Sequence, residues 1–127
     1  MEDKNPLSPH IQIYNWHVSS LISISHRITG IINILALSLV CFWIWTLIFG
    51  SESYQTIYNF FNSFFGKFFV IGFIWSYSFQ ILSEVRHWFW DLGYGFELKT
   101  SNITGVLVII VSILITIILY SIKGILV

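Results

Sequence analysis

The chain has 127 residues, of which 56% are hydrophobic and only 9% are charged, and its net charge is zero. Soluble domains are typically about 25% charged, so this composition excludes an ordinary water-soluble domain. A neutral chain also lacks the strongly basic surface that binds nucleic acid. We therefore interpret residues 1–127 as a single integral membrane domain.

The first 20 residues are polar and contain Pro6 and Pro9. A secretory signal needs a basic start and an apolar core, and this segment has neither. Because it precedes the first long apolar stretch, we expect residues 1–20 to lie along the membrane surface as an interfacial segment. His10 and His17 suit solvent or lipid headgroups.

Three apolar stretches follow, at about residues 21–49, 64–90 and 103–122. Each reaches the roughly 20 residues that a helix needs to cross a hydrocarbon core of about 30 Å. The β-branched residues of the third stretch do not indicate strands, since an open sheet cannot pair its backbone groups in lipid. The predicted fold is all-α, with three transmembrane helices plus the N-terminal interfacial segment.

The basic residues predict an orientation. With three spans, the N-terminal segment and the loop between the second and third helices share one side, which holds Lys4, Arg27, Arg86 and Lys99. The opposite side holds Lys67 and Lys123. The positive-inside rule then places the N-terminus in the matrix or the cytoplasm.

Polar residues gather where the first span begins and the second ends. Ser23 and Arg27 are four residues apart and share a helix face. Antiparallel threading brings His26 and Arg27 to the membrane depth of Arg86 and His87. Ionisable groups at such a depth are costly and mark functional sites, although an arginine near a helix end also reaches the headgroups by snorkelling.

Gln80, Glu84 and His87 follow one another at helical spacing, so they line one face of the second span. A glutamate this far inside a span should point into the bundle or toward a partner. Two interpretations stay open for it: a functional group, or a hydrogen bond that holds another helix.

Three motifs occur in order along the chain: PLSPH at residues 6–10, SISHRITG at residues 23–30 and VRHWFWDLG at residues 85–93. On these motifs the chain resembles the cytochrome b subunits of succinate dehydrogenase (respiratory complex II), the larger membrane anchors of that complex. The resemblance covers essentially the whole chain, although residues 31–75 contribute only apolarity.

The resemblance implies a subunit that is no enzyme by itself but anchors succinate–ubiquinone oxidoreductase and helps form its ubiquinone site. The implied partners are the iron–sulfur subunit, the flavoprotein subunit, a second smaller membrane anchor and phospholipid. The implied location is the mitochondrial inner membrane with the N-terminus in the matrix, or else a bacterial plasma membrane. A haem b-carrying cytochrome and a structural membrane subunit without a redox site are the alternative functions.

The resemblance also assigns residues. Ser23 and Arg27 match the positions that face the quinone, and no catalytic residue or metal ligand is expected. His26 and Arg27 match positions beside the haem propionates, and Arg86 and His87 are grouped with them as candidates for these surroundings.

Members of the family that bind haem b place an axial histidine on the second span, seven residues before the histidine of the third motif, where this chain has Gln80. A neutral amide is a poor iron ligand beside imidazole. His87 is about 10 Å further along the helix axis, too far to replace it. Glu84 stands where the family commonly has glycine. We therefore expect haem b to be absent, or to be ligated from the partner subunit alone.

Overall fold

The computed structural model describes residues 17–126, with side chains from residue 17 to residue 122. Most of the predicted interfacial segment (residues 1–16) lies outside this range, as does the side chain of Lys123. Within the described range the chain is helical apart from short connections. Its elements are α1 (Val18–Thr46), the 3₁₀ helix η1 (Leu47–Phe49), α2 (Ser51–Asn62), α3 (Phe64–Asp91) and α4 (Leu98–Leu126).

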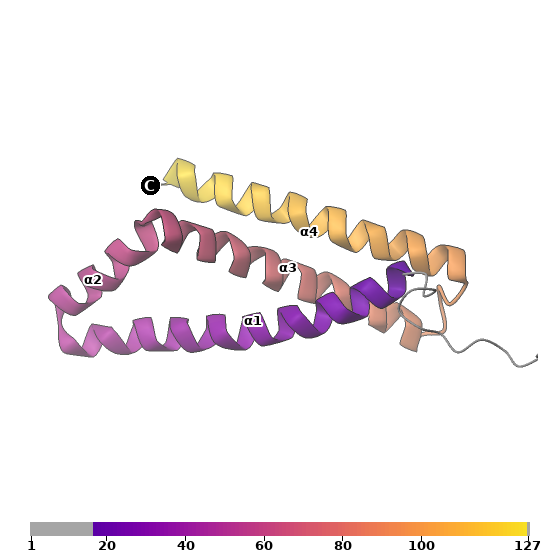
Figure 1. The fold of residues 1–127 in the computed structure, drawn as a ribbon, viewed down its shortest axis with the longest axis horizontal. Coiled ribbons are helices and arrows are strands. Elements are labelled where there is room, and N and C mark those ends of the chain that lie inside the picture. Colours follow the sequence, from indigo (N-terminus) through magenta and orange to yellow (C-terminus); the bar gives the residue numbers. More distant parts are fainter. Residues whose placement is uncertain (1–16, 127) are drawn as a thin grey trace, which may run out of the picture.

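Within the described part of the chain, three segments are long and apolar enough to cross a membrane, namely Val18–Phe49, Phe64–Asp91 and Leu98–Ile122. The predicted all-α fold with three transmembrane helices is therefore confirmed. In Figure 1, α3 lies between α1 and α4, and α1 approaches α3 most closely at the end of the bundle where α1 begins. The predicted orientation in the membrane stays a prediction.

Two of the spans begin earlier than their hydropathy predicts. Helix α1 starts at Val18, so the last residues of the predicted interfacial segment belong to it, and α4 starts at Leu98 instead of residue 103. The first turns of both helices contain Ser, Thr or Asn. These short polar side chains lower the hydropathy while suiting the start of a helix.

The connection between the first two spans contains a helix, α2, that the sequence analysis did not predict. Gly50 reverses the chain before α2 with a φ of 97°, a conformation that favours glycine. Ser63 ends α2 and caps α3, because its hydroxyl accepts a hydrogen bond from the Gly66 N–H at 3.2 Å. Tyr54 of α2 stacks on Trp43 of α1, with ring centroids 5.7 Å apart.

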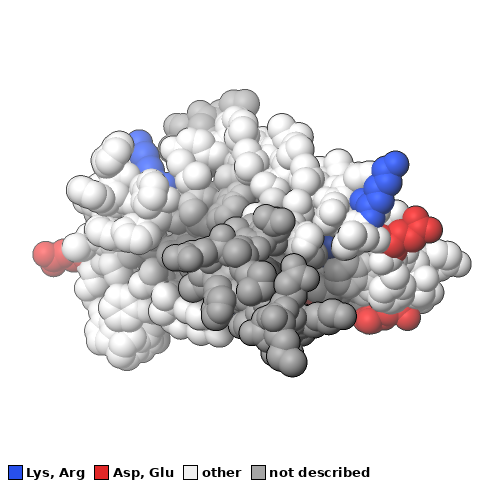
Figure 2. All heavy atoms as spheres, turned by 45° about the vertical axis from the view of Figure 1, so that its right-hand side comes forward, with Lys and Arg blue, Asp and Glu red and all other residues white. Residues whose placement is uncertain are grey.

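The small buried core takes one apolar side chain from each span: Ile22, Phe79 and Val108, which are 2%, 1% and 8% exposed. Small polar side chains pack around it, and among the described residues those that are fully buried are Thr29, Ser76, Ser83 and Ser112. Small residues let membrane helices approach closely. Most large apolar side chains stay exposed. The charged side chains visible in Figure 2 lie toward the two ends of the molecule, as expected when the middle crosses lipid.

Gly105 lies where α4 packs against α1. A methyl group built on its Cα would overlap Ile22 Cδ1 and would lie 3.2 Å from Val18 Cγ1. Ile22 has little room to move, because it is 2% exposed and packs in the core. The close approach of the two helices therefore requires glycine at this position.

We predict that Gly105→Ala destabilises the bundle by about 1–3 kcal/mol, the usual cost of overpacking. Gly72→Ala is the matched control, because a methyl group there meets nothing within 4 Å. The measurement is the apparent thermal midpoint of the purified complex in detergent. Equal midpoints for the two variants would contradict the close packing of α1 against α4.

Candidate functional site

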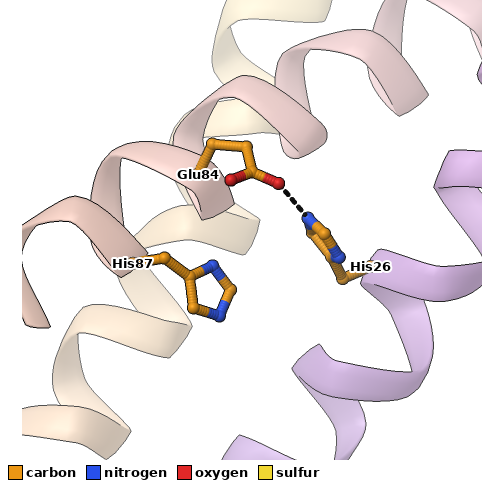
Figure 3. Close-up of side chains that lie close together, drawn as sticks. All are labelled: His26, Glu84 and His87. Carbon is orange, nitrogen blue, oxygen red and sulfur yellow. Dashed lines mark hydrogen bonds and ion pairs between the residues drawn. The ribbon is translucent and has the colours of Figure 1, made fainter. Parts of the chain in front are cut away.

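A row of polar side chains connects α1 to α3, half exposed at Glu84 and buried at Thr29 and Ser76. His26 Nε2 lies 2.9 Å from Glu84 Oε1 and 2.8 Å from the Gln80 amide nitrogen. The other end of the Gln80 amide accepts a hydrogen bond from the Thr29 hydroxyl at 2.8 Å. Figure 3 shows the Glu84 carboxylate pointing across the space between the helices to His26.

The row continues one turn deeper along both helices. Ser76 Oγ lies 3.0 Å from the Thr29 carbonyl oxygen and 2.9 Å from Asn33 Oδ1. We call this set the polar seam, and its members are His26, Thr29, Asn33, Ser76, Gln80 and Glu84. In lipid such groups need internal partners, so the seam fixes how α1 is rotated and positioned against α3.

His87 extends the seam toward the membrane surface. Its ring lies edge-on to His26 with centroids 5.6 Å apart, and edge-on to Trp90 at 5.3 Å. The ligand atoms of His26, Glu84 and His87 all lie within 4.8 Å of one another. Of the four residues expected to meet at one depth, His26 and His87 come together, whereas Arg27 is exposed and Arg86 does not join them.

Arg86 faces the other way, toward α4. Its Nη2 donates to the carbonyl and hydroxyl oxygens of Ser101, both at 2.9 Å, and its Nε donates to Thr104 Oγ1 at 3.1 Å. The guanidinium also lies 4.1 Å from the ring centroid of Trp90. Arg86 is only 6% exposed and takes no part in the seam. It joins α3 to α4 beside a groove of about 430 Å³ that it lines with Trp90 and Thr104.

Ser23 and Arg27 are exposed on α1. The side of α1 that faces α3 carries Ile22, His26 and Thr29. Ser23 and Arg27 each come one residue after a member of this set, so they lie on the adjacent side of the helix. The two predicted quinone residues therefore share one face that borders the seam. They do not lie inside it.

Sequence reasoning missed three members of the seam: Thr29, Asn33 and Ser76. The sequence does contain two indications of these residues. Asn33 and Ser76 are polar residues in otherwise apolar stretches, and Thr29 and Asn33 are four residues apart, so they share a helix face. The sequence could not indicate that these residues meet, because hydropathy does not give the rotation of one span against another.

A sequence model of the succinate dehydrogenase/fumarate reductase transmembrane subunit family matches residues 1–119. The chain belongs to this family. It is 36% identical over 118 residues to the succinate dehydrogenase cytochrome b556 subunit of Rickettsia felis, covering 93% of this chain and 92% of that protein. Identity to the cytochrome b556 subunit of Rickettsia bellii is 37% with the same coverage.

A further relative is the succinate dehydrogenase cytochrome b560 subunit of Reclinomonas americana, 32% identical over 133 aligned positions, which cover 96% of this chain and 88% of the relative. All these relatives are named as cytochrome b subunits of succinate dehydrogenase. The recognised family is thereby confirmed for this chain.

We predict that Arg86→Lys lowers the stability of the α3–α4 pair by about 2–3 kcal/mol, because an ammonium cannot replace the forked contacts to Ser101 and Thr104. The apparent thermal midpoint of the complex should fall accordingly. Lys99→Gln, which changes an exposed cation near the start of α4, serves as the control. If the thermal midpoint of Arg86→Lys is no lower than that of the control, the contacts of Arg86 with Ser101 and Thr104 do not stabilise the α3–α4 pair.

Proposed function

We propose that this chain is the membrane-anchor subunit of a succinate dehydrogenase, which docks the iron–sulfur subunit and helps form the ubiquinone-reduction site. Membership of the transmembrane subunit family supports the assignment. The observation that carries the quinone site is the placement of Ser23 and Arg27 on one exposed face of α1, beside the polar seam.

The chemistry of these two residues suits a quinone. Reduction of a quinone takes two electrons and two protons, so its carbonyl oxygens need hydrogen-bond donors and positive charge nearby. The Ser23 hydroxyl can donate to one carbonyl oxygen, and the Arg27 guanidinium can stabilise the negative charge that develops there. Arg27 lies about 14 Å along α1 from Val18, within reach of the membrane interface. The electrons come from the partner subunits, so this chain does not catalyse the reaction alone.

The proposed location is the mitochondrial inner membrane with the N-terminus in the matrix, and the alternative is a bacterial plasma membrane. Arg27, Arg86 and Lys99 lie toward the membrane side where α1 begins, whereas Lys67 lies near the start of α3 on the opposite side. This distribution supports the proposed orientation. Relatives from Rickettsia and from Reclinomonas are compatible with either membrane.

The relatives are named as cytochromes b, which carry haem. The residues of the polar seam decide whether this chain could ligate one. Gln80 stands where the resemblance expects an axial histidine, and both ends of its amide are engaged, by Thr29 and His26. The Glu84 carboxylate adds a charged group beside the same imidazole. These residues do not fit a haem ligated from this chain. We infer that haem b is absent or is ligated by the partner subunit alone, which disfavours the haem-carrying alternative.

We predict that Arg27→Ala lowers succinate–quinone reductase activity at least about tenfold. Removal of one preorganised donor to a developing negative charge often lowers kcat by about 10²–10³-fold. Arg27→Lys should retain part of the activity, because it keeps the charge. The rate of succinate oxidation with a soluble dye as electron acceptor should be unchanged, because the dye takes electrons from the complex before they reach the quinone site.

Lys67→Ala is the control, an exposed cation on the opposite membrane side. Unchanged quinone reductase activity and unchanged sensitivity to quinone-site inhibitors in Arg27→Ala would contradict the proposed role. That result would favour the structural subunit without a redox site.

A further inference from the structure

Three side chains of the kinds that bind transition metals converge between α1 and α3. They are His26, Glu84 and His87, whose ligand atoms all lie within 4.8 Å of one another. Figure 3 shows the two side chains from α3 and the one from α1 around a common space. The nearest pair, His26 Nε2 and Glu84 Oε1, is 2.9 Å apart. Ligands bound at about 2.0–2.2 Å to one ion have similar or slightly larger separations.

The hydrogen bonding at His26 leaves room for such an ion. Its Nε2 is approached both by Glu84 Oε1 at 2.9 Å and by the Gln80 amide at 2.8 Å. An imidazole nitrogen carries either one hydrogen or one lone pair, so it cannot make a full hydrogen bond with both groups. A metal ion accepts the lone pair and binds the carboxylate at the same time.

Gln80 is compatible with this arrangement. A half-turn about its last bond lets an amide side chain exchange the places of its oxygen and its NH₂ group. Turned over, Gln80 would direct its oxygen to the ion and its NH₂ group to the Thr29 hydroxyl. That hydroxyl already lies 3.1 Å from the His26 carbonyl oxygen, to which it can donate. The Thr29 hydroxyl could then accept from Gln80 and donate to the His26 carbonyl oxygen at the same time.

Charge gives a second reason for a cation here. Glu84 lies about two turns, or about 10 Å, before the end of α3, and its side chain is 50% exposed on this chain. A carboxylate at this depth needs a positive charge beside it. Arg86 is held by Ser101 on α4, and Arg27 is exposed on the face of α1 that borders the seam. Among the residues that the structure describes, the remaining positive charges for Glu84 are a proton on His26 or His87, or a metal ion bound with them.

We propose that His26, Glu84 and His87 bind one divalent transition-metal ion of the zinc class, which joins α1 to α3. Two imidazoles and one carboxylate are a donor set typical of zinc and other first-row ions, whereas magnesium and calcium prefer oxygen ligands alone. The fourth position is open to a water molecule, as in other zinc sites with three protein ligands. The site does not depend on the quinone role of Ser23 and Arg27.

The test uses the intact complex, without an affinity tag, treated with a chelator and then titrated with Zn²⁺. Zinc is counted by mass spectrometry, which separates it from the iron of the partner subunits. We expect one tightly bound Zn²⁺ per complex. Glu84→Gln and His87→Gln should each weaken its binding at least tenfold, since removal of groups that only orient a ligand already costs about 10–100-fold.

Glu97→Gln is the matched control, an exposed carboxylate just before α4, and it should bind zinc like the wild type. Zn²⁺ should also raise the thermal midpoint of the wild type and of this control but not that of Glu84→Gln. If Glu84→Gln fails to assemble, His87→Gln decides the question. No saturable zinc in the wild type, or equal zinc in the ligand variants and the wild type, would overturn the proposal and leave a proton as the shared cation.

Discussion

The ring nitrogen of His26 lies within hydrogen-bonding distance of both Gln80 and Glu84, in the part of the bundle where α1 and α3 come together. In a membrane, such polar groups find no water to replace a lost partner. The contact therefore sets the rotation of α1, which places Thr29 toward α3 and presents Ser23 and Arg27 on the neighbouring face. Both the core below it and the proposed quinone face depend on this arrangement.

Arg27 and Arg86 lie toward the same end of the bundle, where α1 begins and α3 ends, but their surroundings differ. Arg86 is buried and donates hydrogen bonds to Ser101 and Thr104, so it connects α3 to α4. Arg27 is exposed, and its charge is available to a ligand or a partner subunit. The distinction between a structural and a functional cation therefore comes from what each side chain contacts, not from depth.

Hydropathy predicted the three spans because lipid imposes length and apolarity on any helix that crosses it. Antiparallel threading predicted that His26 and His87 would meet. Hydropathy did not predict α2, whose aromatic and polar residues resemble a connection, or that Arg86 would turn to α4. All faces of these spans are largely apolar, so the pattern does not tell which neighbour a given face meets. That choice is made by Asn33, Ser76 and Thr29, which pair only once the helices are assembled.

The central proposal is that His26 of α1 is engaged by Gln80 and Glu84 of α3, so that α3 offers no ligand to a haem. The most direct measurement is a dithionite-reduced minus oxidised absorption spectrum of the purified complex, with extracted haem quantified against flavin. The account predicts no low-spin b-type signal while succinate–quinone reductase activity is retained. A stoichiometric low-spin b-type spectrum, which requires two strong axial ligands, would contradict it.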